Sequence, residues 1–74
     1  MNGTPWEVVL FQSVHHALLA EKVLIEAGIP CKLIPIPRNI SSDCGVCLRF
    51  EPPLRPRVEE ALRGRVEIAK ILPL

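Results

Sequence analysis

The residues of this chain best suited to chemistry are its cysteines, and one of them stands in a polar loop. Residues 37–47 read PRNISSDCGVC, so Cys44 ends a run of small polar residues and is followed by Gly45. Glycine lets a partner approach the backbone closely, and an ionised thiol is a nucleophile. We therefore take Cys44 as the leading candidate for a reactive residue. The alternative is a partly buried loop cysteine without chemistry, since unpaired cysteines are often buried.

Cys47 stands three positions after Cys44 and completes a C-G-V-C spacing. This spacing suggests a dithiol redox pair or half of a zinc site. Redox pairs of this kind open a helix, whereas this pair precedes an expected strand, and zinc would need two further ligands. His15 and His16 do not easily serve together, because adjacent helical residues point about 100° apart. We expect no metal, no cofactor, and an ordinary strand residue at Cys47.

The hydrophobic pattern predicts the elements that must position Cys44. Segments with strand character are 7–12, 31–36, 45–50 and 65–72, and segments with helix character are 14–27 and 56–63. Ser13 stands where the N-cap of the first helix belongs, and Gly28 and Gly64 stand where the helices should end. Pro35 would interrupt a central strand, so we expect its strand at a sheet edge.

The order β-α-β-β-α-β is the signature of an α+β, ferredoxin-like βαββαβ two-layer sandwich. Its antiparallel sheet has the strand order 4-1-3-2. The chain has 74 residues, which limits it to one domain. We therefore expect a single ferredoxin-like domain over residues 1–74, with a flexible N-terminus at residues 1–5.

This topology places the connection between the second and third strands at the same end of the sheet as the start of the first helix. The loop 37–44 is therefore expected beside residues 13–16, where unpaired backbone N–H groups and the positive end of the helix dipole point outward. Such a position lowers the pKa of a thiol and favours the thiolate. The topology thus predicts an activating environment for Cys44.

Three further side chains are candidates to assist Cys44. His16, in the first turn of the expected helix, could hydrogen-bond the thiolate or act as a base. Arg38 could hold an anionic substrate, stabilise the thiolate, or pair with Glu21, which the helical wheel places within the apolar face. The alternatives are a solvated His16 and a Glu21 at the partly exposed rim of the helix. His15 is expected in solvent.

The apolar residues of the first helix are expected on one face, which consists of Val14, Ala17, Leu18, Leu24 and Ile25. The sheet face away from the helices should carry Leu33 and Cys47, together with either Val9 and Phe11 or their neighbours. Such a face is apolar for a surface in water. We therefore expect a homodimer or partner interface on this open sheet face.

Composition argues against several classes of function. The formal net charge is +1 and is spread along the chain, whereas nucleic-acid binding needs a concentrated basic surface. The sequence has no signal-peptide pattern and no apolar run near the ~20 residues of a membrane span. The three cysteines are an odd number, which leaves one unpaired in a monomer and favours a reducing, cytoplasmic location.

Four strings within residues 8–50 occur together in this chain. They read F-x-S-x-H-H-A-L-x-A-E-K, A-G-I-P, L-I-P-I-P-R and I-S-S-D-C-G. In this combination the sequence resembles the selenium/sulfur carrier protein-like family of small bacterial proteins. The pattern P-R-x-I-S-x-x-C-G of that family falls on Pro37, Arg38, Ile40, Ser41, Cys44 and Gly45. Cys47 is not part of the pattern, which argues against an obligatory dithiol mechanism.

The resemblance implies that Cys44 carries sulfur or selenium as a persulfide or selenosulfide. The chalcogen would come from a donor such as a cysteine desulfurase and pass to a biosynthetic acceptor enzyme, so the protein would be a carrier more than an enzyme. Ser13, Ser41 and Arg38 would stabilise the anion, and His16 would assist proton movements.

Two other functions fit the same residues. A non-catalytic ferredoxin-like module would bind a small anion or a protein partner, holding an anion with helix N–H groups and Arg38, and would not need Cys44. A thiol–disulfide exchange protein would join Cys44 to Cys47, which strand geometry disfavours. The sequence leaves open the choice of sulfur or selenium. It also leaves open whether the turn EPPLRP (51–56) docks a partner or only connects two elements.

Overall fold

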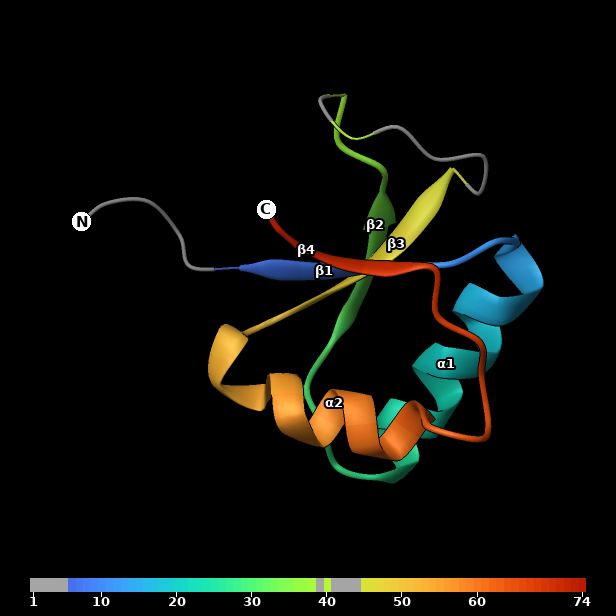
Figure 1. The fold of residues 1–74 in the computed structure, drawn as a ribbon, viewed down its shortest axis with the longest axis vertical. Coiled ribbons are helices and arrows are strands. Elements are labelled where there is room, and N and C mark those ends of the chain that lie inside the picture. The colour runs from blue at the N-terminus through green and yellow to red at the C-terminus, as the bar shows by residue number, and fades with distance from the viewer. Residues whose placement is uncertain (1–5, 39, 41–44) are drawn as a thin grey trace.

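The computed structural model describes residues 6–38, 40 and 45–74 of the chain. Its elements are β1 (Glu7–Leu10), α1 (Val14–Glu26), β2 (Lys32–Pro35), β3 (Val46–Phe50), the 3₁₀ turn η1 (Pro52–Leu54), α2 (Arg55–Leu62) and β4 (Lys70–Pro73). The predicted order βαββαβ is confirmed (Figure 1). The N-terminus predicted to be flexible, residues 1–5, lies outside the described residues.

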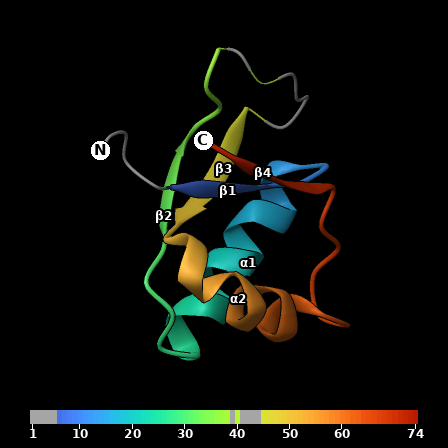
Figure 2. The same cartoon turned by 60° about the vertical axis from the view of Figure 1, so that its left-hand side comes forward.

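The strands form one four-stranded antiparallel sheet in the order β2-β3-β1-β4. This is the predicted ferredoxin-like order read from the opposite edge. The β2 strand lies at an edge, as expected from Pro35, because proline lacks the N–H group that a central strand must donate. Both helices lie on one side of the sheet, so the molecule has two layers (Figure 2).

The register shows which residues lie at each end of the sheet. Leu10, the last residue of β1, pairs with Cys47 near the start of β3 and with Lys70 at the start of β4. We call this the α1 end, because β1 continues from it into α1. At the other end, Arg49 of β3 pairs with Lys32 at the start of β2. We call this the α2 end, because β3 leaves it toward α2.

Buried apolar side chains lie on both faces of the sheet. The helix-side cluster consists of Val9, Phe11, Ala17, Ala20, Leu24, Ile29, Leu48, Phe50, Val58, Leu62 and Val66. On the open face Val8, Leu10 and Cys47 are buried, and Ile34, Ile36, Ile40 and Leu72 pack against them. The register therefore decides the question that the sequence left open: Val9 and Phe11 face the helices.

The prediction for the open face is wrong at Leu33, which packs against the helix-side cluster. Its neighbour Ile34 lies on the open face instead. Successive side chains of a strand point to opposite faces, so an error of one residue reverses the assignment. Val8, Leu10 and Cys47 are at most 5% exposed, so the centre of this face is already covered within the chain. A homodimer through it stays a prediction.

The predicted apolar face of α1 is also wrong in part. Val14, Leu18 and Ile25 are 47%, 47% and 62% exposed. The buried residues of the helix are Ala17, Ala20 and Leu24. The helix is apolar around much of its circumference, so periodicity alone does not choose the packed side. The side with two alanines packs because the distance between packed elements depends on side-chain size, and small side chains allow a close approach.

The strand predicted over residues 65–72 is wrong in its first half, because β4 begins only at Lys70. Gly64 ends α2 with a φ of 77°, and the N–H group of Val66 donates to the carbonyl of Leu62 at 3.0 Å. The chain then crosses from α2 to the edge of the sheet, and Val66 is buried in the core on the way. The apolar pattern that suggested a strand at residues 65–69 therefore comes from the buried connection between α2 and β4.

Candidate functional site at the α1 end of the sheet

Ser13 fixes the start of α1. Its backbone is extended, with a φ of −153°, and its Oγ accepts a hydrogen bond from the backbone N–H of His16 at 3.3 Å. The predicted N-cap is confirmed. The first turn of α1 contains no acidic side chain, so no carboxylate within that turn neutralises the positive end of the helix dipole. The start of α1 is therefore suited to an anionic group.

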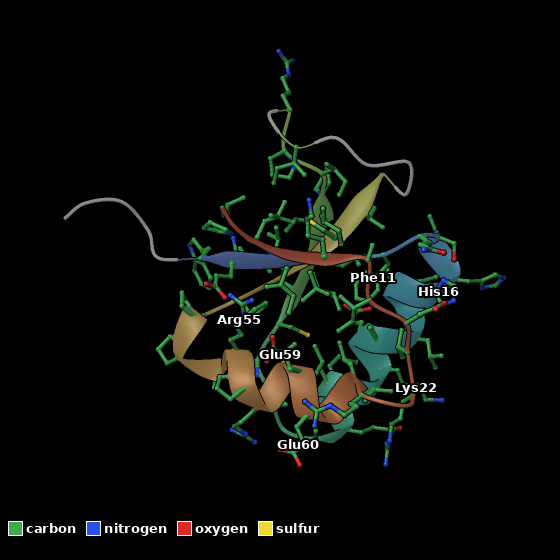
Figure 3. The ribbon with its side chains drawn as sticks, in the orientation of Figure 1. Phe11, His16, Lys22, Arg55, Glu59 and Glu60 are labelled. Atoms are coloured by element: carbon green, nitrogen blue, oxygen red, sulfur yellow. The ribbon has the colours of Figure 1, made fainter. Side chains whose placement is uncertain are left out.

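The imidazole of His16 contacts the same hydroxyl group. The Nδ1 atom of His16 lies 2.9 Å from the Oγ atom of Ser13, in a partly buried position. Because this oxygen already accepts the backbone N–H, the hydroxyl proton is available to Nδ1. When Nδ1 accepts that proton, the proton of the neutral imidazole lies on Nε2, which can then donate to an anion or another acceptor. Figure 3 shows His16 in the first turn of α1.

Gly45 leads the chain into β3 at the same end of the sheet. Its carbonyl accepts the N–H group of Ile36 at 3.1 Å, and Cys47 pairs with Leu10 two residues later. The prediction that this connection lies at the same end of the sheet as the start of α1 is confirmed, whereas the position of loop 37–44 beside residues 13–16 stays a prediction. Cys44 and Ser41, with the roles predicted for them, lie outside the described residues.

The backbone of Gly45 has a φ of 86°. Residues with a Cβ rarely adopt this left-handed conformation, whereas glycine does so readily. A Cβ atom added at Gly45 would meet nothing within 4 Å. The position therefore favours glycine because of its backbone conformation and not because of crowding.

The structure does not join Arg38 to Glu21. Arg38 is exposed and Glu21 is half-buried, and neither takes part in the ion pairs of the described residues. Those pairs belong to Arg55, which lies 3.8 Å from Glu7 and 3.2 Å from Glu59; Figure 3 shows Arg55 and Glu59 on α2. The half-buried position of Glu21 agrees with the rim alternative.

Glu21 instead affects the pKa of a different thiol, that of Cys31. Burial, and then the negative charge of Glu21, raise the pKa of Cys31 above its usual value. A thiol with a raised pKa is a weak nucleophile near neutral pH, because the thiolate is the reactive form. Cys47 is fully buried in the sheet. The two cysteines that the structure describes are therefore poorly suited to chemistry with a partner, each for its own reason.

The described residues do not support a metal site or a membrane span. Within residues 6–38, 40 and 45–74, no group of three His, Cys, Asp or Glu side chains could hold a metal ion. Neither helix in this part of the chain is long and apolar enough to cross a membrane.

Sequence reasoning missed a second polar region, at the α2 end of the sheet. Trp6, Lys32 and Arg49 lie there around one hollow. No local motif marks these residues, because they come from separate segments of the chain. Only the pairing of β2 with β3, which sets Lys32 opposite Arg49, brings the two cations together.

The described structure defines a ferredoxin-like α+β domain in which a capped helix start and the glycine after a cysteine share one end of the sheet. A family model described as "Putative Se/S carrier protein-like" matches residues 7–73, and the chain belongs to this family. Comparison with curated proteins and with solved structures gave no match.

Proposed function

We propose that this protein accepts sulfur or selenium on Cys44, holds it as a persulfide or selenosulfide, and passes it to an acceptor enzyme. The observation that carries the proposal is the pairing of Leu10 with Cys47. This pairing brings Gly45, the residue bonded to Cys44, to the end of the sheet where α1 begins. Membership of the Se/S carrier-like family supports the same conclusion independently.

The α1 end offers an anion both charge and hydrogen-bond donors. The first N–H groups of a helix have no partner within the helix, and α1 has no acidic residue in its first turn. A thiolate or persulfide at this position is stabilised by the helix dipole. In this proposal the Nε2–H group of His16 donates to the same anion, and Ser13 holds the imidazole in that tautomer.

Arg38 and Ser41 are the remaining members of the proposed site. Arg38 is exposed and forms no ion pair with a described residue, so its charge is available to an anion brought by a partner. Ser41, which lies outside the described residues, would add a hydroxyl donor.

The transfer step needs no oxidant or reductant. The Cys44 thiolate attacks the outer sulfur of a persulfide on the donor, for example a cysteine desulfurase. The S–S bond of the donor breaks, the donor cysteine leaves as a thiolate, and a new S–S bond joins that sulfur to Cys44. Passage to the acceptor repeats this exchange with the acceptor thiolate as the attacking group. Selenium would move in the same way from a selenium-bearing donor cysteine.

The test is to locate the added chalcogen by residue. The full chain is incubated with a cysteine desulfurase and cysteine, or with a selenocysteine lyase and selenocysteine, then alkylated and digested for peptide mass spectrometry. We expect the added atom on Cys44, its loss in Cys44→Ser, and its retention in the control Cys31→Ser. If Cys44 stays unmodified, or is modified no faster than Cys31, the proposal is wrong.

A further inference from the structure

Two positive side chains lie directly opposite each other at the α2 end of the sheet. Lys32 of β2 pairs with Arg49 of β3, and residues paired across neighbouring strands point to the same face. This is the open face, because Cys47, two residues before Arg49 in β3, belongs to the open-face cluster. Like charges directly opposite each other destabilise a sheet. Neither cation forms an ion pair with a described residue.

The Arg49 side chain is ordered by an aromatic ring. Its guanidinium carbon lies 4.1 Å from the centre of the Trp6 ring, within the range of a cation–π contact. The Nε atom of Arg49 is buried and has no hydrogen-bond partner among the described residues. A buried donor without a partner is costly. The stacking therefore holds in place a guanidinium group whose Nε donor is unsatisfied among the described residues.

These residues surround a hollow of about 260 Å³, which is lined by Trp6, Pro30, Cys31, Lys32, Arg49 and Glu51. Glu51 is exposed and is the single carboxylate of this lining. The Cys31 thiol adds no negative charge near neutral pH, because burial and Glu21 raise its pKa. The lining therefore carries more positive than negative charge.

A second hollow, which is larger, lacks this charge excess. That hollow, of about 630 Å³, is lined by Arg63, Arg65, Glu59 and Glu67 together with Gly64, Val66 and Ile68. Its two arginines are balanced by two glutamates, and it contains no aromatic residue. Size would favour the larger hollow, but of these two it is the smaller one that combines excess positive charge with a guanidinium group stacked on an aromatic ring.

We propose that the hollow at the α2 end binds a small divalent oxyanion of the phosphate or sulfate class. The guanidinium group of Arg49 offers its planar fork of N–H donors to two oxygens, and the Lys32 ammonium group supplies a second charge. The hollow is separated from Gly45 by four residues of β3, roughly 13 Å of extended chain. Binding there does not depend on the Cys44 chemistry.

Trp6 makes the proposal directly testable, because it is the one tryptophan of the chain. Sulfate or inorganic phosphate is titrated into the full protein at constant ionic strength, with chloride as the exchanged anion. Tryptophan fluorescence and the NMR amide shifts of Lys32 and Arg49 are followed together. We expect saturation in at least one of the two signals and amide shifts centred on this pair.

Matched lysine variants separate a specific site from general charge effects. Lys32→Gln should weaken binding about tenfold, because it removes one charged contact. Lys70→Gln removes the same charge from another strand on the same face and should leave the affinity unchanged. The proposed site would be refuted if the fluorescence and amide-shift changes were absent or did not saturate. It would also be refuted if Lys32→Gln and Lys70→Gln lost equal affinity for the anion. Cys44→Ser should bind the anion as the unmodified protein does, so this test and the chalcogen-transfer test fail independently.

Discussion

The two ends of the sheet differ in the surroundings that they offer to a thiol. At the α2 end, Cys31 lies half-buried beside Glu21, and burial together with that negative charge raises its pKa. At the α1 end, Gly45 follows Cys44, and the nearby start of α1 has Ser13 and His16 and no acidic first turn. Under our proposal, a thiol beside the start of α1 is more reactive than a half-buried thiol beside a carboxylate.

The two ends also differ in how they bind anions under our proposals. The α1 end uses a helix terminus, and its donors include backbone N–H groups that need no particular side chain. The α2 end uses Lys32 and Arg49, which only the strand register brings together. Variants that disturb one end should therefore leave the other unchanged.

Gly45→Ala should have the largest effect on stability at the α1 end. The residue has a φ of 86°, and we expect a loss of about 1–2 kcal/mol in the free energy of unfolding. Urea denaturation measures this loss, and Gly45→Asn should lose less, because asparagine tolerates the left-handed region. An unchanged stability in Gly45→Ala would show that another conformation serves equally well.

Gly28→Ala is the matched control for this substitution. Gly28 has a φ of 75°, and an added Cβ would likewise meet nothing within 4 Å. It should be destabilised to a similar degree, but it follows the far end of α1. Only Gly45→Ala is expected to alter the alkylation rate of Cys44. Equal effects of both variants on that rate would argue against a local role of Gly45.

Ser13→Ala should have a smaller effect on stability and a specific effect on reactivity. Loss of the N-cap costs about 1 kcal/mol, and it also removes the hydroxyl group that lies 2.9 Å from the Nδ1 atom of His16. We expect slower alkylation of Cys44, while anion binding at Lys32 and Arg49 stays the same. Ser13→Thr keeps both the cap and the hydroxyl group, so it should restore the rate. A failure of threonine to do so would contradict the proposed role of the hydroxyl.

The smallest expected effect concerns the pH dependence of stability at the α2 end. The pKa of Cys31 is raised in the folded protein, so the thiol contributes stability below its unfolded pKa. That contribution is lost as the pH rises through the folded pKa. The stability difference between the protein and Cys31→Ala should therefore shrink from about pH 7 to about pH 10. Urea denaturation at several pH values measures it, and a constant difference would show that the Cys31 thiol does not titrate as described.

Features specified by nearby residues could be predicted from the sequence. Ser13 caps α1 through its own side chain, and Pro35 excludes β2 from the sheet centre whatever its neighbours are. The order of strand and helix patterns sufficed for the ferredoxin-like topology. Gly45 was singled out because glycine lets a partner approach closely, which stays a prediction, and its left-handed backbone is known only from the structure.

Features that depend on partners distant in the chain could not be predicted. The choice between Leu33 and Ile34 for the open face requires the register of β2 against β3. The packed side of α1 follows from the close approach that Ala17 and Ala20 permit, whereas the sequence offers apolar residues on several sides of that helix. The same limit explains why the Lys32–Arg49 pair was missed.

We propose that the α1 end activates Cys44, and the sharpest test of this proposal is site-resolved alkylation across a pH series. Iodoacetamide is added to the folded protein, and the rate of modification of each cysteine is measured by mass spectrometry. We predict that the rate at Cys44 rises at a lower pH than the rate at Cys31, by roughly one pH unit or more. A midpoint for Cys44 equal to or above that of Cys31 would contradict the account.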